Sequence, residues 1–214
     1  ICPVGAITEK EFRFKRRVWK LKKTPSICVG CSTGCNVTIE YDKNEVFRLK
    51  PRDNPDVNRW WMCDQGRLTY KDLNIRENRI AHPLGKTAEG FQEISWENAF
   101  SAIREKILEL QPTSNEVIGL VDTHASNEEL YLFKKMLKEG FDSDQLFFPD
   151  LEWEQPVSDF FINSLITSDK SPNRAGARML GLKGAKSSED VTSKISTGTK
   201  VLLVFGKPFE DENL

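Results

Sequence analysis

Before residue 95, the pattern of apolar and polar positions predicts short strands, a short helix and turns. The segments NVTIEY (36–41) and EVFRL (45–49) are β-type runs separated by the polar DKN, which predicts a hairpin. The latter half of RWWMCDQGRLTYKDL (59–73) has the spacing of a short helix. Residues 76–94 are interrupted by Pro83, Gly85 and Gly90, which predict an extended linker or a loose hairpin.

Helical spacing alternates with apolar runs after residue 95. Ser95 can cap a helix that carries Trp96, Ala99, Ile103, Ile107 and Leu110 on one face. Ser126 and Glu129 form a capping-box pattern for a second helix that runs to about Glu139, where Gly140 is expected to end it. EVIGLV (116–121) is expected to form a buried strand, QLFF (145–148) the next strand, and KVLLVFG (200–206) a strongly apolar strand ended by its glycine. This alternation predicts an α/β domain with a Rossmann-like parallel sheet.

The first residues predict a connector that leads into these two parts. EFRFKRRVWKL (11–21) alternates apolar and basic residues, so we expect either a strand with a basic face or a solvated extended arm. Thr24-Pro25 is the expected boundary. The predicted organisation is a connector over 1–24, a small β-rich cysteine domain with its linker over 25–94, and a truncated α/β domain over 95–214.

Composition and charge are those of an ordinary globular chain. The 214 residues are 38% hydrophobic and 29% charged, with a net charge of -1, so no global field favours nucleic acid or a membrane. The sequence contains neither an apolar run long enough to span a bilayer nor a signal-peptide pattern. It starts at Ile1 and closes on DENL shortly after an apolar run, so we expect a piece of a longer protein.

Positive charge gathers in the arm from Lys10 to Lys23, which has eight Lys or Arg and one Glu. Aromatic residues are interleaved with these charges, a pattern that can bind single-stranded nucleic acid. The simpler interpretation, which we favour, is a solvated connector that lies against acidic neighbours in an assembly.

Four of the five cysteines have a spacing typical of a metal centre. Cys28, Cys31, Cys35 and Cys63 give C-x2-C-x3-C-x27-C, with Gly30 and Gly34 between the first three. Zinc sites usually come as two short cysteine pairs, whereas one triplet and one distant singlet favour a [4Fe-4S] cluster. Zinc remains the alternative, and a nucleic-acid-binding zinc module that uses the arm 10–23 is the second hypothesis for function. A unit this small also needs the stability that a metal centre provides.

Other candidate chemistry is weak. His82 and His124 are the only histidines and lack the spacing of a zinc hydrolase, so we expect solvated or core side chains. Phosphate-binding loops and a GxSxG nucleophile motif are absent from the sequence. Trp60 and Trp61 precede Cys63, and we expect them to pack as a lid that excludes water from the cluster.

The connector and the cysteine motif together resemble a known family. CPVGAITEKEFRFKRRVWKLKKTPSICVGCSTGCN, followed by VNRWWMCDQGR, is similar to the large iron–sulfur subunit of bacterial NADH:quinone oxidoreductase, respiratory complex I. ISWENAFSAIREKI, SNEELYLFKKMLKEGF and SDKSPNRAGARMLGLKG resemble segments of the related molybdopterin oxidoreductase superfamily. The resemblance covers nearly the whole chain.

This resemblance implies a set of ligands, cofactors and partners. Cys28, Cys31, Cys35 and Cys63 would ligate a [4Fe-4S] cluster that only some bacterial members possess, off the main electron path. Cys2 would be the last ligand of a second cluster whose other ligands precede Ile1. The implied partners are other peripheral-arm subunits of the NADH dehydrogenase complex, on the cytoplasmic side of the inner membrane. The implied activity, electron transfer, belongs to the whole complex and not to the isolated segment.

The sequence departs from the molybdopterin enzymes at one position. Those enzymes often carry a lysine two residues after the fourth cysteine, whereas Cys63 is followed by Asp64 and Gln65. This departure argues against a relay from cluster to pterin. We therefore expect no molybdopterin, and a chain that transfers electrons or braces the assembly.

Overall fold

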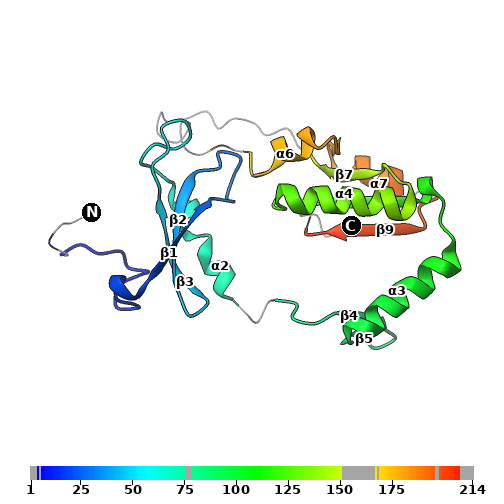
Figure 1. The fold of residues 1–214 in the computed structure, drawn as a ribbon, viewed down its shortest axis with the longest axis horizontal. Coiled ribbons are helices and arrows are strands. Elements are labelled where there is room, and N and C mark those ends of the chain that lie inside the picture. The colour runs from blue at the N-terminus through cyan, green and yellow to red at the C-terminus, as the bar shows by residue number, and fades with distance from the viewer. Residues whose placement is uncertain are drawn as a thin grey trace. The chain divides into compact units, whose positions relative to one another are not determined.

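A computed structural model describes residues 4, 6–75, 79–150, 167, 169–195 and 198–207 (Figure 1). Cys2 lies outside the described residues. The chain divides into two compact units. Unit 1 comprises 1–77 with 153–172, and unit 2 comprises 78–152 with 173–214; each is described by itself.

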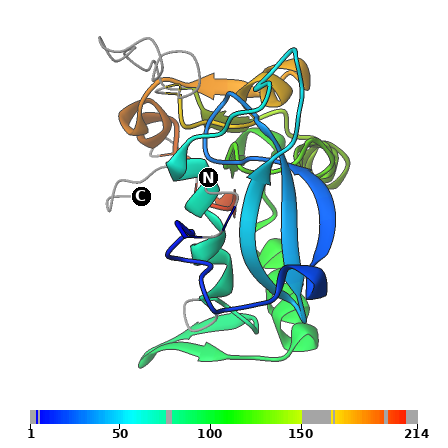
Figure 2. The ribbon, with the colours of Figure 1, turned by 90° about the vertical axis from the view of Figure 1, so that its left-hand side faces the viewer.

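Unit 1 is built on a three-stranded antiparallel sheet in the order β1-β2-β3 (Figure 2). Its strands are β1 (Lys22–Ile27), β2 (Asn36–Asp42) and β3 (Glu45–Pro51). Lys43 and Asn44 turn between β2 and β3 with φ of 49° and 63°. Two positive φ values match the right-handed twist of the flanking strands, and Asn tolerates this conformation. The predicted hairpin is confirmed.

Residues 10–27 differ from the sequence prediction. The predicted boundary at Thr24-Pro25 is wrong, because both residues lie inside β1 opposite Ile39 and Thr38 of β2. Proline is tolerated there because β1 is an edge strand. The predicted strand or extended arm over 11–21 is also wrong, since residues 10–15 form turns and Val18–Lys20 forms the 3-10 helix η1.

Two short helices follow the fourth cysteine, where one short helix was predicted. They are α1 (Asp64–Leu68) and α2 (Tyr70–Asn74). The Asn74 side chain ties α2 to β3, because its Oδ1 accepts from the Val46 N–H at 3.1 Å and its Nδ2 donates to the Val46 carbonyl at 2.7 Å. The buried apolar core of unit 1 is small: Leu21, Val37, Phe47, Leu49 and Tyr70 beside the cysteines.

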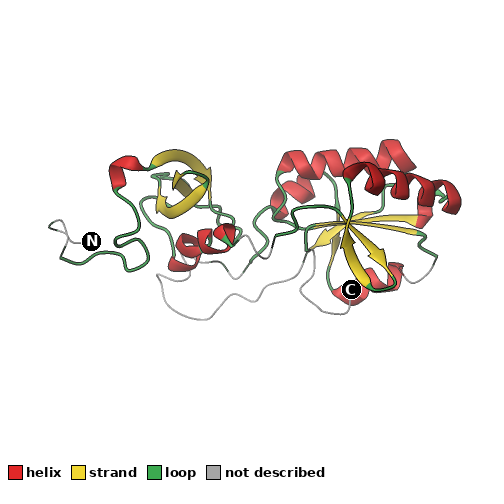
Figure 3. Ribbon diagram, turned by 90° about the horizontal axis from the view of Figure 1, so that it is seen from below, coloured by secondary structure: helices red, strands yellow, loops and turns green. Residues whose placement is uncertain are grey.

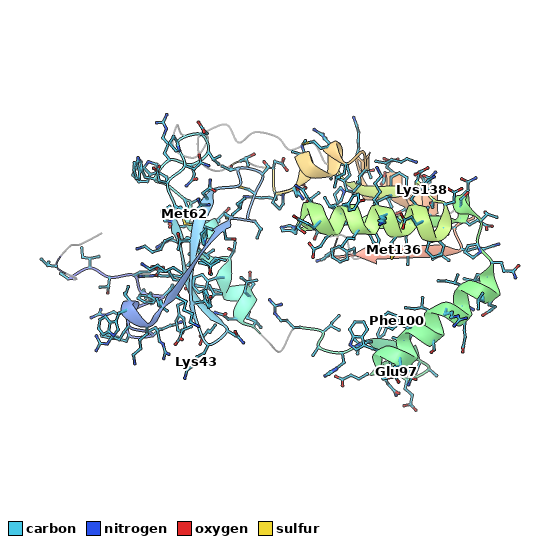
Figure 4. The ribbon with its side chains drawn as sticks, viewed as in Figure 1. Lys43, Met62, Glu97, Phe100, Met136 and Lys138 are labelled. Carbon is cyan, nitrogen blue, oxygen red and sulfur yellow. The ribbon has the colours of Figure 1, made fainter. Side chains whose placement is uncertain are left out.

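Unit 2 begins with a hairpin and a helix. The hairpin pairs β4 (Leu84–Thr87) with β5 (Gly90–Glu93), and α3 (Trp96–Leu110) follows. Ser95 caps α3 as predicted, because its Oγ accepts from the Asn98 N–H at 3.2 Å. None of the α3 side chains is buried, and Phe100 is 62% exposed (Figure 4). The apolar stripe of α3 therefore has no cover within the described part of unit 2.

The centre of unit 2 is a parallel sheet in the order β8-β7-β6-β9 with helices on both faces (Figure 3). The 3-10 helix η2 (Ser114–Glu116) leads into it. The strands are β6 (Val117–Val121), β7 (Leu146–Pro149), β8 (Lys183–Ala185) and β9 (Val201–Phe205). The helices are α4 (Asn127–Phe141), α6 (Arg174–Met179) and α7 (Ser188–Ile195). The predicted strands and the α/β class are confirmed.

Alternate side chains of β6 enter two separate cores. Val117 and Val121 pack in one core with Leu130 and Leu137 of α4. Ile118 and Leu120 pack in the other core with Val191 of α7. Burial of both strand faces explains the continuous apolar run of this strand.

The second long helix begins where predicted and ends later. The capping box is confirmed, with the Ser126 N–H donating to Glu129 Oε2 at 2.7 Å and the Glu129 N–H donating to Ser126 Oγ at 3.2 Å. The prediction that Gly140 ends the helix is wrong. The helix continues to Phe141, and Asp142 ends it with φ 50°, a left-handed conformation that Asp tolerates.

Candidate metal centre

The first three cysteines lie on the loop that joins β1 to β2. The Cys28 N–H donates to the Cys35 carbonyl at 2.8 Å, which closes the loop and brings its two ends together. Gly34 has φ 63°, a conformation that favours glycine, so the sharp turn before Cys35 depends on this residue. Cys28, Cys31 and Cys35 are all buried.

Asn58 holds the segment that carries the fourth cysteine against the start of β2. Its side chain is 2% exposed, and its Oδ1 accepts from the Asn36 N–H at 2.9 Å. Its Nδ2 donates to the carbonyls of Trp61 at 2.9 Å, Arg52 at 3.3 Å and Asn36 at 3.4 Å. Asn36 directly follows Cys35, so this one amide joins the two cysteine-bearing segments. Sequence reasoning missed Asn58, because an asparagine in a polar loop carries no sign of burial.

All four cysteines line one pocket. Its other lining residues are Gly30, Met62, Gln65, Gly66 and Lys170. Gly66 leaves space for the thiols: a Cβ on it would lie 2.8 Å from Cys28 Sγ and 3.5 Å from Cys63 Sγ. The structure thus brings together the four predicted ligands. Among the described residues, no group of three or more His, Cys, Asp or Glu side chains is placed to hold a single metal ion.

Backbone amides point at two of the sulfurs. The Gly30 N–H donates to Cys28 Sγ at 3.4 Å, and the Gly66 N–H donates to Cys63 Sγ at 3.2 Å. Cys63 is the N-cap residue of α1, so Gly66 is one of the first amides of that helix. Such N–H groups stabilise negative charge on sulfur.

Burial makes Cys28 and Cys35 resist ionisation. Burial, reinforced by the other three thiols, raises the pKa of Cys35 to about 11. Burial also raises the pKa of Cys28, against the opposing effects of the Gly30 N–H and the charge of Lys170. Metal binding to this pocket must therefore displace protons. Four thiols on one pocket, two directed amides and a glycine whose Cβ would fill the space all fit an iron–sulfur cluster.

The predicted tryptophan lid is wrong. Trp60 and Trp61 are 69% and 59% exposed, and neither lines the pocket. Met62 instead packs against Cys28 and Cys35. The tight turn around Asn58 leaves both indole rings facing solvent. Their position close to Cys63 in the sequence does not reveal this orientation.

A lysine from a distant segment lines the same pocket. The Lys170 Nζ donates to Gln65 Oε1 at 3.2 Å, and the Ser32 N–H donates to the Asp169 carbonyl at 3.0 Å. Sequence reasoning missed Lys170 because 105 positions separate it from Gln65.

The remaining candidates are not among the residues that line the cysteine pocket. His82 and His124 are both exposed, and His124 Nδ1 lies 2.9 Å from Asp122 Oδ1. The basic arm folds onto its own unit: Arg16 pairs with Asp42, and Arg48 lies over the Phe12 ring at 4.1 Å from its centroid. The described helices include none long and apolar enough to cross a membrane.

Comparisons with known proteins agree with this geometry. Residues 21–71 match the model of the NADH-ubiquinone oxidoreductase NDSU1/NuoG-like 4Fe-4S domain, which spans all four cysteines. Residues 79–151 match the molybdopterin oxidoreductase family. The resemblance predicted from the sequence is confirmed.

The relatives that this chain matches are named as subunits of one enzyme class. The chain is 36% identical over 137 residues to the NADH-ubiquinone oxidoreductase 75 kDa subunit of Reclinomonas americana, 64% of this chain and 19% of that protein. It is 35% identical over 139 residues to NADH-quinone oxidoreductase subunit 3 of Thermus thermophilus, 64% of this chain and 17% of that protein. It is 37% identical over 138 residues to the mitochondrial NADH dehydrogenase (ubiquinone) iron-sulfur protein 1 of Solanum tuberosum, 64% of this chain and 18% of that protein. The chain thus spans about a fifth of these relatives.

Proposed function

We propose that the chain is the cluster-bearing portion of the large iron–sulfur subunit of an NADH:quinone oxidoreductase. Cys28, Cys31, Cys35 and Cys63 are the proposed ligands of one [4Fe-4S] cluster. The observation that carries this proposal is the single pocket lined by all four thiols, inside the segment that matches the NuoG-like domain.

When bound, the cluster supplies one-electron transfer. The protein's own residues hold it and control its surroundings. The N–H groups of Gly30 and Gly66 donate to the ligand sulfurs, which favours negative charge on them. Met62 gives the pocket an apolar wall that limits contact with water.

The activity and the partners belong to the proposed complex. The chain would transfer electrons or brace the peripheral arm together with other subunits, on the cytoplasmic side of the membrane. Cys2 would complete a second cluster. The α/β domain, which we propose to be Rossmann-like, would serve as a scaffold without molybdopterin; the parallel order β8-β7-β6-β9 with helices on both faces supports that fold.

Anaerobic reconstitution tests the ligand set. The chain treated with iron and sulfide should turn brown and hold about four irons with a reducible EPR signal. Replacing any one of Cys28, Cys31, Cys35 or Cys63 by serine should lower the iron content and abolish or alter that signal.

Cys2→Ser is the matched control and should leave the iron content unchanged. A colourless protein that holds one zinc would contradict the proposal. Four serine variants that all retain the native iron content and signal would exclude this ligand set.

A further inference from the structure

Lys170 stands out among the residues around the cysteine pocket. Of the described residues that line this pocket, it is the only one with a positive charge. The others are the four cysteines, two glycines, a methionine and a glutamine. A cluster held by four thiolates is negatively charged, so an ammonium group at its edge acts on it directly.

Two contacts position Lys170, one at its ammonium group and one at the backbone of the preceding residue. The Nζ donates to Gln65 Oε1 at 3.2 Å, and Gln65 itself lines the pocket two residues after Cys63. The preceding residue is held by the backbone, since the Asp169 carbonyl accepts from the Ser32 N–H between Cys31 and Cys35 at 3.0 Å. The segment of Lys170 thus contacts both cysteine-bearing stretches.

The neighbouring carboxylate of Asp169 is hydrogen-bonded to the backbone of its own turn. Asp169 Oδ1 accepts from the Ser171 N–H at 2.9 Å, and the Asp169 N–H donates to Thr167 Oγ1 at 3.1 Å. On the other side, Asp64 pairs with Arg67 at 2.9 Å. Neither carboxylate is among the residues that line the pocket, whereas the Lys170 side chain is.

We propose that Lys170, held by Gln65, supplies the positive charge that stabilises the reduced state of the cluster. This inference rests on the proposed cluster on Cys28, Cys31, Cys35 and Cys63. Adding an electron makes the cluster more negative, so a nearby fixed cation favours reduction and raises the reduction potential. Lys170 is a tuning residue in this role and not a ligand.

Potentiometric EPR titration of the reconstituted 214-residue chain tests the charge. Lys170→Met should retain its iron but lower the equilibrium constant for reduction about tenfold, which is about 59 mV for one electron. Lys170→Arg keeps the charge and should stay close to the native potential. Added salt should reduce the difference between the native chain and Lys170→Met, because salt screens a partly exposed charge.

Lys43→Met is the matched control. It removes the same charge in the same unit, at the turn of the β2–β3 hairpin, and Lys43 does not line the pocket (Figure 4). Its potential should equal that of the native chain. Gln65→Leu removes the acceptor that holds the ammonium group and should shift the potential in the same direction as Lys170→Met, by less.

The possible outcomes separate this inference from the proposed function. A native chain that binds no iron would overturn the proposed function, and the role of Lys170 with it. Normal iron and an unchanged potential in Lys170→Met would overturn the role of Lys170 alone. If Lys170→Met loses its iron, retention by Lys170→Arg supports a need for charge, and loss in both variants contradicts it.

Discussion

The thiol pocket leaves no room for a larger side chain at Gly66. Because a Cβ there would lie 2.8 Å from Cys28 Sγ, Gly66→Ala must displace a ligand sulfur. We expect this variant to bind less iron after reconstitution while unit 2 stays folded. Iron content and the absorbance of the cluster measure the effect.

Gly140→Ala is the control for the same change of side chain. Gly140 lies inside α4, and a Cβ there would meet nothing within 4 Å. Alanine should therefore stabilise unit 2 by up to about 1 kcal/mol without any effect on iron. Full iron binding by Gly66→Ala would show that the pocket yields easily and would contradict the close fit at this position.

Asn58 concentrates four hydrogen bonds in one buried amide. Asn58→Ala removes them all and leaves the Asn36 N–H without this acceptor, so it should lower the free energy of unfolding by about 1–3 kcal/mol. The fourth cysteine should also be held less firmly. Urea unfolding measures the stability, and the rate of iron loss to a chelator measures the hold on the cluster.

Asn115→Ala provides the comparison for an exposed amide. Asn115 is exposed in η2, so its loss should change the stability by less than about 0.5 kcal/mol. If the two substitutions lower the free energy of unfolding equally, then the hydrogen bonds of Asn58 contribute nothing to stability beyond local backbone propensity.

At the scale of elements, the sheet of unit 1 is organised around a buried carboxylate. The Glu40 side chain on β2 is 2% exposed and contacts Arg48 of β3, with the ammonium group of Lys23 on β1 at 3.7 Å. Arg48→Met leaves a buried charge without its close partner. We expect a loss of roughly 3–5 kcal/mol in the free energy of unfolding, measured by urea titration.

The double variant Glu40→Leu/Arg48→Met removes both charges and should recover most of that loss, because two apolar side chains of similar volume replace the pair. If Arg48→Met alone costs less than about 1 kcal/mol, then Lys23 or water compensates and the strands do not depend on this pair.

The elements were predictable from the sequence wherever local periodicity controls them. The β2–β3 hairpin, both serine caps and the strands β6, β7 and β9 follow from spacing and turn chemistry alone. The turns of the arm before Leu21 were not predictable from the sequence. They depend on contacts with Arg48 and Asp42, which come from elsewhere in the chain. The end of α4 was missed because Asp142 can adopt a left-handed conformation as glycine does.

The candidate site was predictable only in part, because some of its residues are positioned by contacts between distant parts of the chain. The spacing of the cysteines identified the four thiols that line the pocket. Asn58 and Lys170 act through long-range contacts, and no local pattern marks them. The exposure of Trp60 and Trp61 depends on the turn at Asn58, so it could be determined only from the structure.

At the scale of the whole molecule, the two units have different sources of stability. Unit 2 has a parallel sheet with an apolar core on each face, formed around Val117 and Ile118 of the same strand. Unit 1 has a small apolar core beside the cysteines, so its stability should depend on the metal centre.

Removal of the cluster should therefore loosen one unit and leave the other intact. After treatment of the reconstituted chain with a chelator, hydrogen exchange should accelerate at the amides of 28–35 and 58–66, where the backbone is ordered around the thiols. The amides of β6 should keep their protection, because both faces of that strand stay buried whether or not iron is bound. The variant Cys63→Ser, reconstituted in the same way, should give the same pattern without chelator. Simultaneous loss of protection in β6 would show that the two units unfold together and that the metal centre stabilises the whole chain.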